Sequence, residues 1–140
     1  MPDVPARLSS VTVGVREFEV MRSFYRGLGW AEGSSSGEPY AVFRTDGAFL
    51  ALFPVDALAA DAQTSPAAFK GQTFAMYVER PDLVDETIAA LRTAGARVVK
   101  EPGEAFGGRS AYFTDPEDNL WEVAWLPSVR FHEDGALRDL

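Results

Sequence analysis

Few side chains in this sequence could do chemistry at a defined point, and Glu122 is the foremost of them. It lies in an apolar stretch, Leu120–Trp125, where alternation predicts a strand with Glu122 and Ala124 on one face. Such a carboxylate could hydrogen-bond a ligand, hold a cation, or act as a general base with a pKa raised by burial. It could equally pair with an arginine or with backbone donors, or meet water. Because no partner acid is evident beside it, the support for catalysis is weak.

Aromatic and hydroxyl side chains at alternate positions of other predicted strands would share a sheet face with Glu122. Such a face is apolar with a few hydroxyls, so it suits enclosing a planar or hydrophobic molecule better than polarising a reactive one. The same aromatic residues could instead simply fill a core. On the binding interpretation, we expect the ligand to contact Ser10, Thr12, Phe49, Ala51, Phe53, Thr73, Tyr77, Tyr112 and Glu122.

A glycine-rich segment, Phe106-Gly107-Gly108-Arg109, adds one more candidate, Arg109. Consecutive glycines allow a loop to move or to approach a ligand closely. The guanidinium of Arg109 could hold an anionic group of a ligand or pair with Glu122. An ordinary surface turn is the alternative. The segment is not of the phosphate-binding type, because it does not join a strand to a helix and no Lys-Ser or Lys-Thr follows it.

The composition limits the class of protein. The chain has 140 residues, 46% of them hydrophobic, which suffices for one domain with a real core. Cysteine is absent, which excludes disulfides, thiolate nucleophiles and cysteine-ligated metals. A net charge of −8 repels phosphate backbones and anionic membrane surfaces, so neither nucleic acid nor a membrane is an expected partner. No signal-peptide pattern and no apolar stretch of roughly 20 residues is present, so we expect a cytoplasmic protein.

The predicted elements occur twice in the same order: a strand, a helix and three strands. The first module covers residues 7–54, a connector covers 55–72, and the second module covers 73–127. Each predicted helix ends at a glycine suited to a C-cap, Gly29 or Gly95. Periodicity therefore predicts an α+β fold in a single domain, residues 1–140, built from a repeated unit. We expect residues 128–140, which are charged and lack periodicity, to form a surface tail.

Three motifs in this order resemble those of the vicinal-oxygen-chelate superfamily, the glyoxalase, bleomycin-resistance and dioxygenase proteins. They are Ser10–Val15, the helix end Ser23-Phe24-Tyr25-x-x-Leu28-Gly29-Trp30, and Ala111–Val123. The resemblance implies two βαβββ modules that form a cup-like, eight-stranded open barrel with the helices outside, and it implies a homodimer. In the turn Asp115–Asp118, Asp118 replaces the family's usual glycine, which the hairpin tolerates because Asp adopts turn conformations.

The resemblance also bears on metal binding. Metal-dependent members place four ligands, usually His and Glu, on the first and last strands of each module, and these positions correspond here to Ser10, Ala51, Thr73 and Glu122. Only Glu122 among them is a good metal ligand. The one histidine, His132, lies beyond the last strand. We therefore expect no metal and no other cofactor.

Two main functions remain open. The first is a metal-independent protein, similar to the bleomycin-resistance branch, that binds a small aromatic or hydrophobic antibiotic or metabolite. The second is an enzyme of the same superfamily, of lyase, isomerase or dioxygenase type, that uses Glu122 with a non-standard or absent metal site. A regulatory protein that senses a metabolite is a third possibility. The predicted lining favours the first, because sequestration requires shape and stacking but no reactive group.

Overall fold

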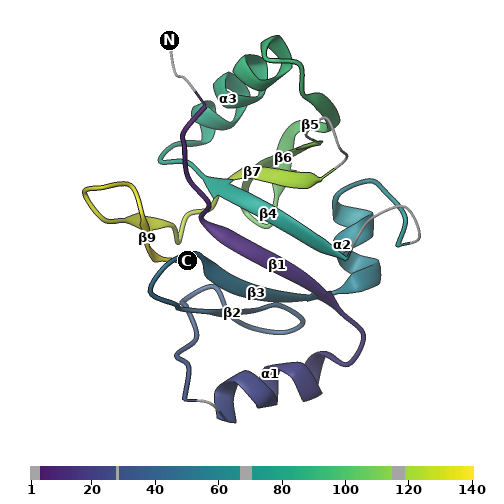
Figure 1. Ribbon diagram of the computed structural model, residues 1–140, viewed down its shortest axis with the longest axis vertical. Coiled ribbons are helices and arrows are strands. Elements are labelled where there is room, and N and C mark those ends of the chain that lie inside the picture. The colour runs from purple at the N-terminus through teal and green to yellow at the C-terminus, as the bar shows by residue number, and fades with distance from the viewer. Residues whose placement is uncertain (1–3, 28, 67–70, 115–118) are drawn as a thin grey trace.

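The computed structural model describes residues 4–27, 29–66, 71–114 and 119–140. The elements in chain order are β1 (Ser10–Val15), α1 (Phe18–Gly27), β2 (Ala41–Phe43), β3 (Phe49–Pro54), α2 (Val55–Asp61), β4 (Gln72–Tyr77), α3 (Pro81–Thr93), β5 (Arg97–Ala105), β6 (Gly108–Thr114), β7 (Leu120–Trp125), β8 (Arg130–Phe131) and β9 (Leu137–Asp139). Seven strands form one sheet in the order β2-β3-β1-β4-β7-β6-β5 (Figure 1), and β8 pairs with β9. Within the described ranges, no helix has the length and apolar character that a membrane crossing requires.

The strand pairing relates the two halves of the sheet to each other. In each half, the first strand pairs in parallel with the last, β1 with β3 and β4 with β7. The two first strands, β1 and β4, pair antiparallel and join the halves at the centre of the sheet. Helices α1 and α3 follow the first strand of their respective halves. The predicted mixed α+β architecture is therefore confirmed.

The first half has one strand fewer than expected. In place of the first of the three strands expected after the helix of the first module, there is a single bridge between Glu32 and Phe43. The segment that follows, residues 33–39, consists mainly of glycine, serine and proline, which favour turns over a continued ladder. The described residues thus form a seven-stranded sheet, and the eight-stranded barrel is not observed. The turn expected at Asp115–Asp118 lies outside the described residues.

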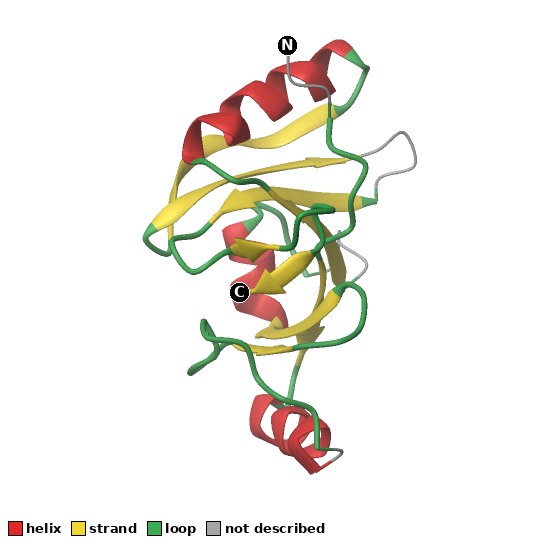
Figure 2. Cartoon of the chain, turned by 90° about the vertical axis from the view of Figure 1, so that its left-hand side faces the viewer, coloured by secondary structure: helices red, strands yellow, loops and turns green. Residues whose placement is uncertain are grey.

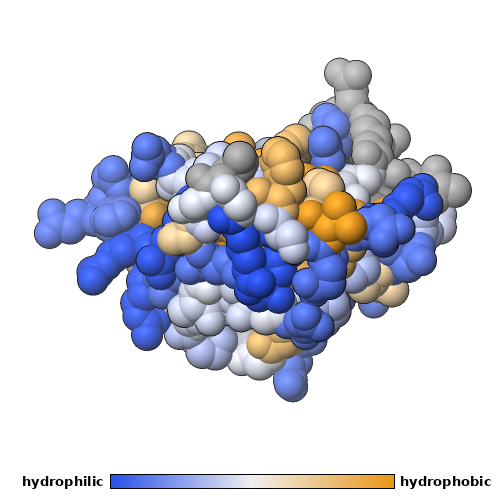
Figure 3. Space-filling view, turned by 90° about the horizontal axis from the view of Figure 1, so that it is seen from below, coloured by the Kyte–Doolittle hydropathy of each residue, from blue (hydrophilic) through white to orange (hydrophobic). Residues whose placement is uncertain are grey.

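Helices α1 and α3 cover one face of the sheet, which we call the outer face. The apolar side of α1 packs on β1, β2 and β3, and that of α3 packs on β4, β6 and β7. The two helices lie at opposite ends of the molecule (Figure 2). Gly29 and Gly95 follow them with φ of 82° and 99°, the left-handed conformation that the C-cap prediction requires. At the α1 end, apolar residues stand in small groups among hydrophilic ones (Figure 3).

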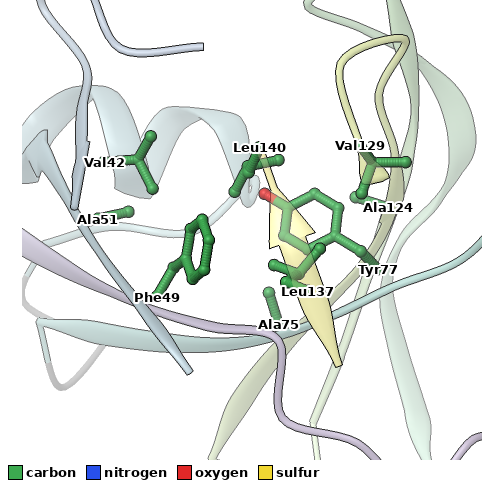
Figure 4. Packing of buried hydrophobic residues seen from close by; sticks show 9 residues of the cluster. All are labelled: Val42, Phe49, Ala51, Ala75, Tyr77, Ala124, Val129, Leu137 and Leu140. Carbon is green, nitrogen blue, oxygen red and sulfur yellow. The ribbon is translucent and has the colours of Figure 1, made fainter. Parts of the chain in front are cut away.

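The opposite, inner face of the sheet is partly filled by the C-terminal segment. Val129, Leu137 and Leu140 are buried in one cluster with inner-face residues of the sheet, and Figure 4 shows Leu140 near Phe49 of β3 and Val129 beside Ala124 of β7. The expectation that residues 128–140 form a surface tail is therefore wrong for these side chains. Sequence reasoning missed them because isolated apolar residues between charged ones give no periodic pattern.

Hydrogen bonds hold this segment in place. The Ser35 amide donates to the Leu140 carbonyl oxygen at 2.8 Å, and Arg44 Nη2 donates to Asp139 Oδ1 at 2.9 Å. Burial acts to raise the pKa of Asp139, but the hydrogen bonds from Ser34 and Arg44 outweigh it and lower the pKa to about 2. Asp139 is thus ionised over the whole physiological range. The C-terminal segment is part of the folded structure, and it limits the space that remains on the inner face.

Candidate ligand-binding site

A cavity of about 370 Å³ remains on the inner face beside the C-terminal segment. Its wall comes from β1, β3, β4, β6 and β7, from α2, and from the segments before β2, between β5 and β6, and after β7. The volume falls in the range of roughly 300–1,000 Å³ that is typical of small-molecule sites. The elements that form this wall belong to both halves of the repeat, so the cavity depends on how the halves are joined.

Three aromatic rings form one wall of the cavity. The rings of Tyr40 and Phe53 meet edge to face with their centroids 5.8 Å apart, and those of Phe53 and Phe106 do so at 6.1 Å. Phe106 lies in the turn between β5 and β6 with a φ of 51°, and 71% of its surface is exposed. A large apolar ring exposed in an uncommon backbone conformation is a candidate for contact with a ligand.

A chain of polar groups adjoins the cavity, and Asp61 and Tyr112 of this chain line it. The Tyr112 hydroxyl donates to Asp61 Oδ2 at 2.7 Å, and Lys100 Nζ donates to Asp61 Oδ1 at 3.2 Å. Glu122 lies directly opposite Tyr112 in the β6–β7 register. Asp61, at the end of α2, therefore links the helix to the sheet through two hydrogen bonds.

Glu122 is held mainly in its protonated form at neutral pH. Burial raises its pKa and so does the negative charge of Asp61, while Lys100 and Tyr112 act in the opposite direction, and the result is a pKa of about 8. Tyr112 has one hydroxyl proton, which Asp61 accepts in this structure. While that bond exists, Glu122 can hydrogen-bond the Tyr112 oxygen only as a protonated donor.

The remaining hydroxyl groups around the cavity are neutral, and two of them, those of Ser35 and Ser110, have no hydrogen-bond partner among the described residues. Burial raises the pKa of Tyr40 and of Tyr77, and the Tyr77 hydroxyl donates a hydrogen bond to the Tyr40 oxygen. Ser110 is only 3% exposed, and its Oγ finds no hydrogen-bond partner in the part of the chain that the structure describes. A buried hydroxyl without a partner costs about 1–3 kcal/mol. Because Ser110 lines the cavity, a polar group of a ligand could satisfy it.

Comparison with known proteins agrees with the motifs in the sequence. The model of the glyoxalase/bleomycin resistance protein/dioxygenase superfamily matches residues 7–123, nearly the whole chain. The chain belongs to this superfamily. The resemblance to vicinal-oxygen-chelate proteins is thereby confirmed. A search of curated proteins finds no match to the sequence.

Several solved structures share the fold of this superfamily member at low sequence identity. A structure described as an NAD-dependent benzaldehyde dehydrogenase from Legionella pneumophila has a TM-score of 0.68 and 18% identity over 83% of this chain and 96% of its own. The hypothetical protein BH1468 from Bacillus halodurans has a TM-score of 0.62 and 18% identity, and the match covers 90% of this chain and 98% of its own. An Mn(II)-bound glyoxalase from Novosphingobium aromaticivorans has a TM-score of 0.55 and 21% identity, and the match covers 96% of this chain and 42% of its own. Identities this low support similarity of fold alone.

The cavity brings together five of the residues predicted from the sequence to contact a ligand: Thr12, Phe53, Tyr77, Tyr112 and Glu122. The other strand residues in that prediction share the inner face but do not line the cavity. Phe49 and Ala51 are covered by the C-terminal segment, and Ser10 and Thr73 are 0% and 1% exposed. Alternation predicts the correct face in each case, but it does not predict which part of the face is covered.

Arg109 does not lie in the cavity. Its Nε and Nη2 donate to Asp85 Oδ2 and Oδ1 at 2.6 and 2.7 Å, so it pairs with α3 and not with Glu122. The reason is strand phase, since Arg109 alternates with the inward-facing Ser110 and Tyr112 and must point to the outer face. The suggested contact of Arg109 with Glu122 or with an anion in this cavity is therefore wrong.

Sequence reasoning missed several polar residues of the cavity wall, among them Asp61 and Ser110, and it missed Lys100, which pairs with Asp61 beside the wall. Ser110 could have been found, because it lies two residues before Tyr112 and thus on the same face of β6. Asp61 gives no such signal, since it lies at the end of a seven-residue helix in the connector. Its distance in sequence from Lys100 and Tyr112 means that only the tertiary fold reveals the contact.

The donor set of the inner face does not fit a divalent metal ion. In the described part of the chain, no three His, Asp or Glu side chains converge on one point. At the four positions that the resemblance assigns, Ala51 has no donor atom, Ser10 and Thr73 offer neutral hydroxyls, and Glu122 is mostly protonated at neutral pH. The chemistry of these residues gives no basis for a step that uses a metal.

Proposed function

We propose that this superfamily member binds a small aromatic or hydrophobic molecule, an antibiotic or a metabolite, in the inner-face cavity without a metal ion. The observation that carries the proposal is the combination of an aromatic wall with a buried, unpartnered hydroxyl, Ser110 Oγ, around one cavity. A ligand with an aromatic body and a polar group would complement both features.

The aromatic wall supplies the affinity in this proposal. Covering the exposed part of Phe106 would remove on the order of 100–150 Å² of apolar surface from water, which contributes about 3 kcal/mol. Edge-to-face contacts with Tyr40 and Phe53 orient a flat ligand. Neither contribution requires a reactive group or a metal.

A thermal-shift screen of aromatic antibiotics and metabolites, carried out in EDTA, tests the proposal, because a ligand of the native state raises the melting temperature. Calorimetric titration of the compounds that stabilise the protein then gives their affinities. We expect Phe53→Ala to weaken binding at least tenfold. Phe24→Ala is the matched control, since Phe24 is 57% exposed on α1 and does not line the cavity. Stabilisation that required added Mn²⁺ or Zn²⁺, or that was equal in the two variants, would contradict the proposal.

A second candidate function is proton transfer by Glu122. Its carboxyl group has a pKa of about 8, contacts the cavity and shares Tyr112 with Asp61, so it could exchange a proton with a bound molecule near neutral pH. Compounds that bind are incubated in D₂O and examined by NMR for deuterium incorporation or rearrangement. Exchange that disappears in Glu122→Gln would favour an enzyme, and its absence would favour binding alone. The homodimer implied by the resemblance remains a proposal, which light scattering on the purified protein checks.

A further inference from the structure

All the ionisable side chains in the cavity wall that could carry a full charge at neutral pH are acidic. Glu38, Asp61 and Glu122 contribute to the wall, and no lysine, arginine or histidine does so within the described residues. Asp61 has a counter-ion in Lys100 at 3.2 Å, and Glu38 lies 3.8 Å from Arg22. Glu122 is within ion-pair distance of no basic side chain in residues 4–27, 29–66, 71–114 and 119–140. The cavity therefore contains one carboxyl group for which the described chain provides no cationic partner.

Acceptor groups lie side by side around this carboxyl group. Tyr112 and Ser110 alternate on the inward side of β6, opposite Glu122 and Ala124 of β7. Since Ala124 has no polar side chain, the space in front of it adjoins both Glu122 and the unpartnered Ser110 Oγ. A hydroxyl oxygen and a carboxylate are both acceptors for N–H groups. The positions thus match a donor that bears several hydrogens.

From this arrangement we infer that the ligand of the cavity is an organic cation, an aromatic or hydrophobic molecule whose protonated amine binds between Glu122 and Ser110. The inference rests on the proposed function and names the chemical class of its ligand. An ammonium group brings three N–H donors. Its positive charge would favour the ionised form of Glu122, which is otherwise mostly protonated at neutral pH. The nearby tyrosine rings add favourable contacts, because a cation is attracted to the face of an aromatic ring.

Other ligand classes fit these contacts less well. An anionic ligand would be repelled by Asp61 and could approach Glu122 only in its protonated form, and the described wall has no basic side chain to bind the anion. A neutral alcohol or carbonyl compound could satisfy Ser110 but carries no charge that would favour the ionised form of Glu122. The net charge of −8 also raises the concentration of cations near the surface.

Three probes with the same aromatic body test the inference: 2-phenylethylamine, 2-phenylethanol and 3-phenylpropionate. Their affinities for the full chain are measured at pH 7 in EDTA by calorimetry and by saturation-transfer NMR. We expect the amine to bind at least tenfold more tightly than the alcohol, and the carboxylate to bind more weakly than both. Salt should weaken binding of the amine more than that of the alcohol.

Matched variants assign the effect to the site. Glu122→Gln keeps the shape of the side chain and should bring the affinities of the amine and the alcohol to within about twofold of each other. Ser110→Ala should weaken binding of the amine while the protein stays folded, as judged by its melting curve. Glu133→Gln removes an exposed carboxylate outside the cavity and should leave the tenfold preference unchanged.

The outcomes separate the inference from the proposed function. If the alcohol binds as tightly as the amine to the unaltered protein, the ligand is not an organic cation but the binding function stands. Preference for the amine that persists in Glu122→Gln would also overturn the inference. If none of the three probes binds at millimolar concentration while Phe53→Ala has no effect on any compound from the screen, the proposed function fails as well.

Discussion

Replacing Glu122 with glutamine should stabilise the protein, and the gain should grow as the pH rises. In the unfolded chain the carboxyl group has its ordinary pKa of 4.5, whereas burial raises the pKa to about 8 in the folded protein. The folded state therefore binds more protons than the unfolded state between these values, and the free energy of unfolding falls as the pH increases. Glutamine removes this dependence while it preserves the shape and can still donate to the Tyr112 oxygen.

The size of the effect follows from the two pKa values. Each pH unit between them costs about 1.4 kcal/mol of folding free energy, so the penalty is absent below pH 4.5, reaches about 3 kcal/mol at pH 7 and levels off near 5 kcal/mol above pH 8. Glu122 faces a cavity that admits water, which screens its charge, so these figures are upper values. We expect Glu122→Gln to raise the free energy of unfolding by about 2–4 kcal/mol at pH 8 and by less than 1 kcal/mol at pH 5.

Urea unfolding of both proteins at pH 5, 6, 7 and 8 measures the effect. Taking the difference between variant and parent at each pH cancels every other titrating group that the two proteins share. Glu133→Gln, at an exposed position, is the control and should track the parent within about 0.5 kcal/mol at all four values. A difference for Glu122→Gln that stayed constant from pH 5 to pH 8 would refute the reasoning, because it would show that folding does not perturb this carboxyl group.

Three further substitutions probe the fold and the site. Leu137→Ala should lower the free energy of unfolding, measured in urea, by about 2–4 kcal/mol, because Leu137 is buried on the inner face. The control Val20→Ala, at a position 65% exposed, should change it by less than about 0.5 kcal/mol. Equal small losses in both variants would mean that Leu137 is not buried. Tyr112→Phe should cost about 1–3 kcal/mol at pH 6, since Asp61 loses a hydrogen bond inside the protein, and an unchanged midpoint would mean that this bond is not formed. Arg109→Gln should lower the free energy of unfolding by no more than about 1 kcal/mol, because the ion pair of Arg109 with Asp85 is partly exposed. Calorimetry should find that the variant binds ligand within twofold of the parent's affinity. A tenfold loss of affinity would show that Arg109 contributes to the site.

Much of the inner face was predictable because a strand reverses its side chains at every residue. The positions of Thr12, Phe53, Tyr77, Tyr112 and Glu122 on one face follow from alternation alone, and all five line the cavity. The same rule, applied to Arg109, would have placed it on the outer face with Asp85. That error came from treating the residue as part of a flexible loop when it belongs to the regular strand β6.

The contacts that depend on distant segments were not predictable in this way. Asp61 meets Lys100 and Tyr112 only because α2 lies across the ends of strands from both halves. Leu137 and Leu140 reach β3 because the chain folds back after β7. Local sequence does not predict either contact, because in each one a short, mainly polar segment meets a strand that is distant in the chain.

By itself, the sequence determined the mixed α+β architecture, the face on which each strand residue lies, and the poor supply of metal-binding groups on the inner face. These follow from period, from glycine at helix ends and from residue chemistry. Only the tertiary structure decided which part of that face stays open and whether Glu122 in the open part is protonated at neutral pH. Burial and the neighbouring Asp61 fix that charge, and both arise from segments that the fold brings together from across the chain.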